Sequence, residues 1–510
     1  MNKAQLIRKR KRQLKRRLKK SVRSNTSRQP TLSQQTVKYD MSARIRAIGH
    51  GGIGLVNNMV SRVGLPKAIN EKLSLLKCYV PYMESDHVLN IAYNSLLGGT
   101  CLEDIELRRN DENHLDALGA ESIPDPTTAG DFCRRFQPDA IDDLMDAINS
   151  VRQSVWAEQP DDFFDKAVID ADGTAVTTLG ECKEGMDINY KGDWGYAPLL
   201  VSLANTREPL YLLNRSGNRP SQEGAAAYLD RAGELCQQAG FRHVVLRGDT
   251  AFAQTAYLDG WNERDWQFTF GMDACPSYVK KADTLSEGGW IPLERAAKYE
   301  VKTVSREKPE KVKEEVVRQR NYKNITLEHE HVSEFNWKPE KCKREYRMIV
   351  LRKSLLVYKG EELLFPDTRY FFYITNDWKA SAATIVLSAN QRCNQENLIQ
   401  QLKGGIKALH APVNSLNANW AYMVMSSLAW SLKAWLALLM PVKGRWKRRH
   451  KKQQLAILNM EFKCFLNSYI LIPCQIIHKA RQSIYRILSC PPEIDIFLRM
   501  AGAMATPMRI

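Results

Sequence analysis

A chain of 510 residues can bury at least two hydrophobic cores, so we expect a multi-domain enzyme. Its eleven cysteines include no Cys-x2-Cys pair, which argues against a disulfide framework or a structural zinc site and favours a reducing cytoplasm. The net charge of +17 is concentrated, because residues 1–38 hold fourteen Lys and Arg and no acid and leave only +3 for the rest. This distribution is typical of proteins that bind a polyanion.

Residues 1–38 form a basic segment with few apolar positions. It cannot bury much surface and is expected to be disordered when alone. It is either an arm that contacts DNA or a solvated tail. The candidate phosphate contacts are Lys9, Arg10, Lys15 and Arg16.

Residues 41–160 are expected to be helical. Ser85-Asp86 can cap one helix, and Pro126-Thr127-Thr128 with Asp131 resembles a capping box that opens another. In the second helix Phe132 and Phe136 would pack while Arg134 and Arg135 face outward. The segment is either a helix-turn-helix-like reader of DNA ends, with these arginines on phosphates, or a plain structural helix.

Residues 167–174, AVIDADGT, predict a buried strand that carries two carboxylates. Asp170 and Asp172 are two residues apart, so both point to the same face of a strand. A carboxylate in a core strand is costly to bury unless a cation meets it, which favours a functional site. The alternative is an ordinary strand end followed by an Asp-Gly turn.

Further segments extend this pattern to about residue 274. Residues 196–203 and 210–213 predict two strands, residues 221–238 an Ala-rich helix, and residues 241–249 a strand that ends in Gly248-Asp249. Three antiparallel strands, a crossover helix and a parallel strand bring the ends of the first and fourth strands side by side. We therefore expect Asp172 to lie next to Asp249.

Residues 275–366 predict a β-rich insertion, which either holds DNA or is a scaffold excursion. Residues 369–375 then return as a fifth core strand. Residues 390–403 have helical character, which would bring Arg392, Glu396 and Lys403 within roughly 40° of each other on one face. Residues 419–440 are the one membrane candidate, but polar residues interrupt them and favour a buried core helix.

Residues 441–510 are expected to combine a basic loop with C-terminal helices. The basic run from Lys443 to Lys452 contains seven Lys and Arg, among them Arg448 and Arg449. It is either a loop beside DNA or a solvated run of charge. Residues 462–500 are expected to be helical.

The three acids and their surroundings resemble the DDE transposases of bacterial insertion sequences, whose catalytic core has the RNase H-like fold of retroviral integrases. The resembling features, in the family's order, are Asp172, Tyr190-Lys-Gly-x2-Gly-Tyr-x-Pro-Leu-Leu, Gly217-Asn218, Asp249-x2-Phe252 and Arg392-x3-Glu396-x6-Lys403. They span about residues 165–440. Ala389 and Ala197 depart from the pattern, since the family usually has Tyr and His there.

This resemblance implies an α/β fold with three parts. They are a mixed five-stranded RNase H-like sheet, in two stretches at residues 161–274 and 367–440, a β-rich insertion at residues 275–366, and a helical DNA-binding region at residues 41–160.

Three converging carboxylates need a cation, because two of them about 4 Å apart repel by roughly 4 kcal/mol at an effective dielectric of 20. An all-oxygen set of ligands selects Mg²⁺ or Mn²⁺ over zinc. The resemblance implies two such ions held by Asp172, Asp249 and Glu396, with Arg392 and Lys403 neutralising phosphate oxygens. Asp170 is the alternative to Asp172; the family's usual Asp-x-Thr favours Asp172.

The resemblance also implies the activity: cleavage at the ends of an insertion sequence and transfer of the freed 3′-hydroxyl into target DNA. The expected partners are double-stranded DNA, as terminal inverted repeats and target, and a second copy of the chain in a homodimer. No membrane is expected, and the expected location is the nucleoid in a bacterial cytoplasm. Two alternatives stay open: another RNase H-like nuclease, and a catalytically retired protein that only binds DNA.

Overall fold

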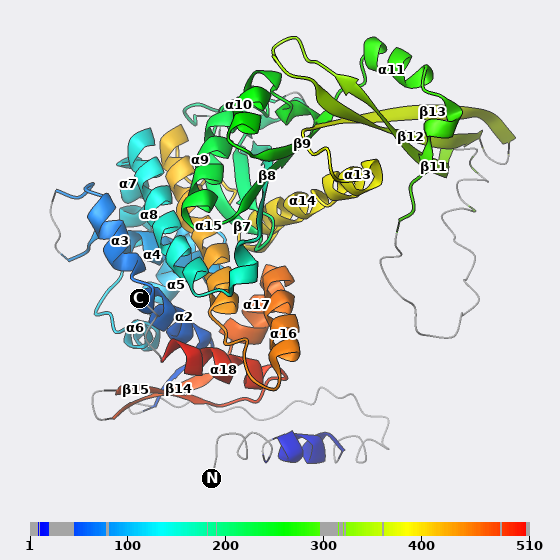
Figure 1. Cartoon of the computed structure of the whole chain (residues 1–510). Helices are drawn as coiled ribbons and strands as arrows, with labels where there is room; N and C mark the ends of the chain where they lie inside the picture. Colours follow the sequence, from blue (N-terminus) through cyan, green and yellow to red (C-terminus); the bar gives the residue numbers. More distant parts are fainter. Residues whose placement is uncertain are drawn as a thin grey trace. The chain divides into compact units, whose positions relative to one another are not determined.

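The structure of the chain, a computed structural model, describes residues 9, 11–19, 45–77, 81–180, 182–189, 191–295, 315, 320, 323–359, 362–479 and 482–505. It contains two compact units (Figure 1). The sheet unit comprises residues 160–400, and the helical unit comprises residues 1–159 together with residues 401–510. The chain therefore leaves the helical unit once and returns to it after residue 400.

A mixed sheet of nine strands forms the centre of the sheet unit, in the order β10-β11-β12-β13-β9-β8-β2-β6-β7. The strands are β2 (Lys166–Gly173), β6 (Leu199–Leu203), β7 (Glu208–Leu213), β8 (His243–Gly248), β9 (Gln267–Met272), β10 (Ile291–Pro292), β11 (Lys323–Trp337), β12 (Tyr346–Lys359) and β13 (Glu362–Thr375). β2 pairs antiparallel with β6 and parallel with β8, and β6 pairs antiparallel with β7. The expected adjacency of the first and fourth strands is thus confirmed.

Helix α9 (Ala225–Gln238) connects β7 to β8 and packs on β2, β6 and β8. It begins after Gly224, whose φ of 75° lies in the left-handed region that glycine adopts without strain. Gly233 lets the helix approach Trp266, because a Cβ at this position would lie 2.4 Å from the indole ring. The small residues of the segment therefore set how closely the helix packs.

The sheet is larger than the five strands expected. The parallel strand after β8 is β9, of which residues Gln267 to Phe270 pair with β8, whereas the prediction placed the fifth strand at residues 369–375. Those residues lie in β13, which pairs antiparallel with β9 and continues the sheet into β12 and β11. The β-rich segment is therefore an extension of the main sheet, and its long strands were read as separate because their pairing partners lie far away in the sequence.

The segment predicted as one strand at residues 196–203 is divided. A separate small sheet has the order β3-β5-β4 and consists of β3 (Val176–Thr177), β4 (Asp187–Ile188) and β5 (Trp194–Tyr196). Pro198, which has no N–H for a sheet ladder, lies between β5 and β6. The strand of the main sheet therefore starts only at Leu199.

The other helices in the described part of the sheet unit are short. They are η2 (Asp161–Phe164), η3 (Thr250–Phe252), η4 (Thr255–Tyr257), α10 (Leu258–Glu263), α11 (Pro276–Asp283), η5 (Glu287–Gly289), α13 (Ala382–Asn390) and α14 (Cys393–Gln400). On α13, Ile385 and Val386 pack in a buried apolar cluster with Val332 of β11 and Ile349 and Leu351 of β12. This cluster docks α13 on the sheet.

The helical unit consists of helices and a small three-stranded sheet with the order β1-β14-β15. Its elements are α2 (Gly52–Arg62), α3 (Leu65–Lys72), α4 (Glu84–Leu96), η1 (Leu102–Ile105), α5 (Glu106–Arg109), α6 (Glu112–Leu118), α7 (Pro126–Arg134), α8 (Pro138–Ala157), η6 (Gln401–Gly405), α15 (Leu416–Leu438), α16 (Lys447–Asn459), α17 (Phe462–Phe465), η7 (Leu466–Ile470), α18 (Ile494–Met504), β1 (Arg46–Ile48), β14 (Cys474–Lys479) and β15 (Gln482–Ile487). Residues 11–19 are also helical.

Helix α15 is the core of this unit. Every residue from Ala418 to Leu438 is buried, and the helix packs against α4, α7, α8 and α16. The prediction of a buried core helix is confirmed. Within the described part of the chain, no helix combines the length and the apolar character needed to cross a membrane.

Two local predictions in the helical unit were wrong. Helix α7 is capped by Asp125, whose carboxylate accepts a hydrogen bond from the N–H of Thr128 at 2.8 Å, with Pro126 at the first helical position. The segment expected to be helical at residues 462–500 contains the hairpin of β14 and β15, which pairs with β1. The hairpin itself is local, but the third strand of its sheet, β1, lies more than 400 residues earlier in the chain.

Candidate active site

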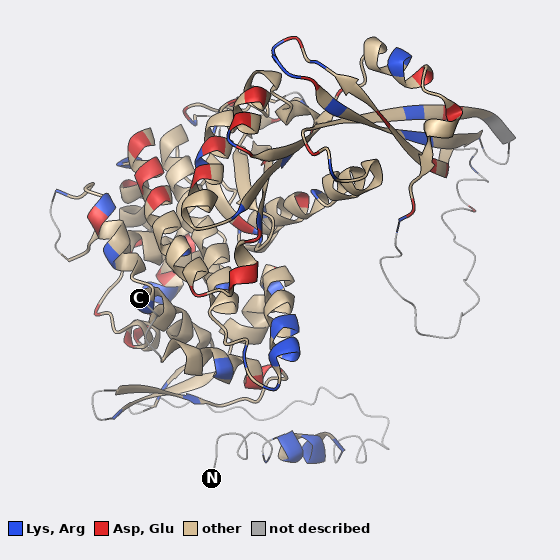
Figure 2. Cartoon of the chain, viewed as in Figure 1, with Lys and Arg blue, Asp and Glu red and all other residues tan. Residues whose placement is uncertain are grey.

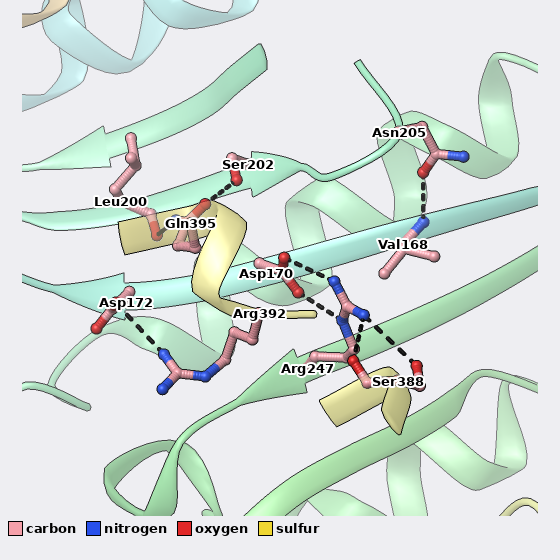
Figure 3. A network of polar contacts seen from close by, with 10 residues as sticks. All are labelled: Val168, Asp170, Asp172, Leu200, Ser202, Asn205, Arg247, Ser388, Arg392 and Gln395. Atoms are coloured by element: carbon pink, nitrogen blue, oxygen red, sulfur yellow. Dashed lines mark hydrogen bonds and ion pairs between the residues drawn. The ribbon is translucent and has the colours of Figure 1, made fainter. Parts of the chain in front are cut away.

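Asp170 and Asp172 both lie on β2, but they have different surroundings. Asp170 is buried, with 1% of its surface exposed, and is aligned with Arg247 on the parallel strand β8. Both of its carboxylate oxygens accept hydrogen bonds from Arg247, at 2.7 and 2.8 Å (Figure 3). Burial raises the pKa of Asp170, and the guanidinium of Arg247 opposes the rise.

Asp172 lies near the end of β2 and remains partly accessible, with 14% of its side chain exposed. Its Oδ2 lies 3.3 Å from Nη1 of Arg392. The pKa of Asp172 is raised to about 6, mainly by burial; the charge of Arg392 opposes this rise, and the charges of Asp249 and Glu396 contribute to it. Asp249 and Glu396 therefore lie within electrostatic reach of Asp172.

Asp249 follows the last residue of β8. Its carboxylate accepts a hydrogen bond from the N–H of Ala251 at 2.9 Å and thereby caps the 3₁₀ turn η3. Gly248 permits this turn, because a Cβ there would lie 2.6 Å from the Cβ of Phe252. The strand end and the cap together fix the position of Asp249 beside β2.

The segment expected as one helix around Glu396 is broken. Helix α13 ends at Asn390, Arg392 lies in the two-residue turn that follows, and Glu396 lies on α14 with 62% of its side chain exposed. The guanidinium of Arg392 reaches Asp172 through Nη1 and lies 4.0 Å from Oε1 of Glu396 through Nη2. Arg392 therefore lies between two of the three candidate acids.

Lys403 does not continue the face of α14. It lies in the π-helical turn η6 (Gln401–Gly405), which belongs to the helical unit. A π turn has a different angular spacing from an α-helix, so the predicted alignment of Lys403 with Arg392 and Glu396 does not apply. Leu398, Leu402, Ile406 and Leu409 are buried, as the pattern predicted.

Two polar residues of this region were missed in the sequence. Gln395 is buried on α14; its Oε1 accepts a hydrogen bond from the hydroxyl of Ser202, and its Nε2 donates to the main-chain oxygen of Leu200 at 3.2 Å. The second is Arg247. The sequence did contain a signal for Arg247, because an arginine inside an apolar strand that is predicted to lie beside a buried Asp is an obvious ion-pair partner. It contained no such signal for Gln395, which looks like any solvent-facing amide.

The three acids do not form a ready metal cluster. In the described ranges, no group of three or more His, Cys, Asp or Glu side chains is arranged to hold a metal ion. Arg392 supplies positive charge to Asp172 and Glu396 in this arrangement. Asp172, Asp249 and Glu396 therefore influence one another electrostatically, but their carboxylates are not arranged around a common metal position.

The candidate DNA contacts lie on the surface of the helical unit. Arg134 is 2.5 Å from Asp131 and also donates to Asn414, and Arg135 donates to the main-chain oxygen of Leu75 at 3.4 Å. Phe132 and Phe136 are buried beneath them, as predicted. Lys9, Lys15, Arg16, Arg448 and Arg449 are exposed. Arg10, Tyr190 and most of residues 296–322 lie outside the described residues.

Three comparisons with known proteins extend these observations. A family model described as Transposase DDE domain group 1 matches residues 30–501. Among solved structures, the chain is similar to the piggyBac transposase in its synaptic complex with hairpin DNA, with a TM-score of 0.32, 10% identity and 82% of each chain covered. No curated protein matches the chain.

Proposed function

Because the chain belongs to the DDE transposase family, we propose that it cleaves DNA at the ends of an insertion sequence and joins the freed 3′-hydroxyl to target DNA. One observation carries the assignment of the site. Asp172 and Asp249 lie at the ends of the neighbouring parallel strands β2 and β8, and Arg392 contacts both Asp172 and Glu396. Burial is the main cause of the raised pKa of Asp172, and the charges of Asp249 and Glu396 add to it. This arrangement supports the assignment of the three acids as the catalytic triad of the family.

The donor set fits a hard divalent cation. The three side chains offer only oxygens, which Mg²⁺ and Mn²⁺ prefer. A cation would stabilise the charged form of Asp172 against the burial, and the lesser repulsion by Asp249 and Glu396, that raise its pKa. We assign Asp172, Asp249 and Glu396 as the ligands of two such ions. When bound, a pair of ions activates a water or a 3′-hydroxyl and stabilises the leaving oxygen of a phosphodiester.

Asp172 is a better candidate than Asp170. Both oxygens of Asp170 are used by Arg247, and its side chain is fully buried. Asp172 keeps part of its carboxylate accessible and makes a single longer contact with Arg392. A buried pair is costly to break, whereas a partly exposed one can exchange partners. The accessible residue is therefore the one able to bind a cation.

The remaining residues of the site act on the DNA. When a metal ion neutralises Asp172 and Glu396, Arg392 is released from them. Its guanidinium can then bind a phosphate oxygen of the reacting strand. Lys403 is proposed to contact a DNA phosphate. We propose further phosphate contacts by the two basic clusters and by Arg134 and Arg135, in a homodimer that holds two element ends. The clusters are the arm with Lys9, Arg10, Lys15 and Arg16, and the start of α16 with Arg448 and Arg449.

The test is cleavage of a duplex that carries the inverted repeats flanking the gene, by purified full-length protein with Mg²⁺. We expect nicking at the repeat end, and a loss of at least about a thousandfold in Glu396→Gln, because the amide loses the anionic oxygen that holds a cation. Asp162→Asn, an exposed acid of η2, is the matched control and should keep wild-type activity. Equal nicking by wild type and Glu396→Gln would exclude the assignment.

A catalytically retired DNA-binding protein is the second candidate. It is favoured by the contact of Arg392 with Asp172 and Glu396, because a guanidinium can neutralise these two acids without a metal ion. This candidate predicts repeat-specific binding that is unaffected by Mg²⁺ and no nicking by the wild type. Cleavage of any four-way junction or RNA–DNA hybrid in preference to the repeat duplex would favour another nuclease.

A further inference from the structure

One buried guanidinium links the two strands that carry Asp172 and Asp249 to α13, the helix that precedes the one with Glu396. Arg247 lies on β8, two residues before Asp249. Its Nε and Nη2 donate to Asp170 on β2, two residues before Asp172. Its Nη1 donates to the main-chain oxygen of Ser388, at 2.7 Å, in the last turn of α13 (Figure 3).

The guanidinium of Arg247 is held in one orientation, because it is buried and each of its three nitrogens donates a hydrogen bond. Asp170 and Arg247 are 1% and 3% exposed, so neither charge can turn toward water. The two parallel hydrogen bonds to Asp170 hold the guanidinium in one plane. Because that plane is fixed, the position of Nη1 is fixed too, and Nη1 donates to the main-chain oxygen of Ser388.

The contact at Ser388 is placed where it controls a turn. Main-chain oxygens in the last turn of a helix lack the donors of a following turn. The oxygen of Ser388 accepts from the N–H of Gln391, at 3.1 Å, as well as from Arg247. Arg392 is the next residue, and its main-chain N–H donates to the oxygen of Ala389 at 3.2 Å. The side chain of Arg247 therefore ties the end of α13, and with it the turn that carries Arg392, to the sheet.

We propose that Arg247 is a positioning residue: by holding Asp170 and the Ser388 oxygen together, it fixes the turn at residues 391–392 and so sets how Arg392 and Glu396 approach Asp172 and Asp249. This inference rests on the proposed function for the role of those acids. Gln395 assists from the other side of the turn, because its amide ties α14 to β6 at Ser202 and Leu200.

Arg247→Lys is the informative variant. A lysine keeps the positive charge opposite Asp170 but has a single nitrogen, so it cannot span Asp170 and Ser388 with the planar fork of a guanidinium. The pair Asp170→Leu with Arg247→Met removes both charges and leaves neither buried alone, which preserves folding while the contact with Ser388 is lost.

Arg347→Lys is the matched control. Arg347 is 6% exposed on β12 and holds the segment that precedes the same helix, through the main-chain oxygens of Asp377 and Ala380 and an ion pair with Glu334. The control therefore removes a similar buried fork from the opposite end of α13. General loosening of the helix would affect both lysine variants alike.

Hydrogen exchange of the full-length protein tests the positioning directly. We expect the amides of residues 389–396 to exchange at least about tenfold faster in Arg247→Lys and in the double variant than in the wild type, and at the wild-type rate in Arg347→Lys. Unchanged exchange in Arg247→Lys, or an equal rise in Arg347→Lys, would overturn the proposal.

Kinetics on the repeat duplex test its consequence. Arg247→Lys should lower kcat for nicking by at least about a hundredfold while KM and DNA affinity stay within threefold, and Arg347→Lys should change neither by more than threefold. A change in KM or affinity with an unchanged kcat would contradict the proposal. If the wild type does not nick DNA, the proposed function fails, and the exchange comparison still decides the role of Arg247.

Discussion

Arg247 and Arg392 each pair with a carboxylate of β2, yet the two pairs have different physical roles. The Asp170–Arg247 pair is buried and bidentate, at 2.7 and 2.8 Å. Breaking such a pair by removing one partner costs about 3–5 kcal/mol, because the other charge stays buried. The Asp172–Arg392 pair is longer, at 3.3 Å, and both side chains are partly exposed. It can be exchanged for a cation or a phosphate at little cost.

A single buried lysine provides a prediction at the same scale. Lys433 on α15 is 1% exposed; its Nζ donates to the main-chain oxygens of Leu458 and Met460, at 3.0 and 2.6 Å, and lies over the Trp430 ring. Those oxygens are at the C-terminal end of α16, which favours a cation. We expect Lys433→Met to lower the free energy of unfolding by about 2 kcal/mol in urea titrations.

Lys452→Met, at an exposed position of α16, is the control for the loss of a lysine. It should change the free energy of unfolding by less than about 0.5 kcal/mol. A variant at position 433 as stable as the wild type would mean that the cost of burying the ammonium group equals the benefit of its hydrogen bonds.

At the scale of elements, the path from α13 through α14 to η6 explains why the predicted helix face failed. A projection at 100° per residue requires an unbroken α-helix. Here a turn at residues 391–392 precedes α14, and a π turn follows it. Π turns are frequent at functional sites, because the extra residue changes the direction of the side chains that follow. The apolar face was predicted correctly, but these two interruptions were not.

The buried histidines of the helical unit predict a dependence of its stability on pH. His50 lies just before α2, and its Nε2 is hydrogen-bonded to Nδ1 of His114 on α6 at 2.9 Å. His87 on α4 stacks on Phe132 of α7. Burial lowers the pKa of each of the three to about 4. Between pH 6.5 and 4 the unfolded chain therefore binds more protons than the folded one, so stability falls as the pH falls through this window.

At pH 5 we expect each of these histidines to reduce the free energy of unfolding by about 2 kcal/mol relative to pH 7.5. Urea titrations at both pH values measure the difference. His114→Gln, which cannot titrate, should remove roughly one third of it. A variant with the full wild-type pH dependence would show that His114 is already protonated or exposed in the folded state.

At the scale of the whole molecule, the excess of positive charge is concentrated in two segments of the chain. Figure 2 shows Lys and Arg gathered on the helix at residues 11–19 and on the first turns of α16. The sequence outside residues 1–38 and 443–452 carries a net charge of −4. A polyanion is therefore attracted by these two segments, whatever the local geometry of the acids.

This distribution predicts how DNA binding depends on salt. Each phosphate contact contributes roughly −0.9 to the slope of log K against log salt concentration. Lys15→Gln combined with Arg16→Gln should therefore make the slope shallower by about 1.8, as measured by fluorescence anisotropy on a repeat duplex.

The matched control, Lys67→Gln with Lys72→Gln, removes the same charge from exposed positions of α3. It should leave the slope unchanged. Equal effects of the two double variants would mean that net charge, and not contact by the arm, governs binding.

The sequence by itself determined the residue types of the site, the adjacency of the first and fourth strands and the burial of α15, because local periodicity marks each strand and each buried helix. It did not determine the full strand order, since β9 and not β13 lies next to β8 in the sheet. It did not determine which of Asp170 and Asp172 is accessible. Side chains two apart on a strand share a face, so parity cannot separate them. Only the fold brings Arg247, 77 residues away, to Asp170 and leaves Asp172 beside Arg392. The choice depends on which cation each carboxylate meets in space.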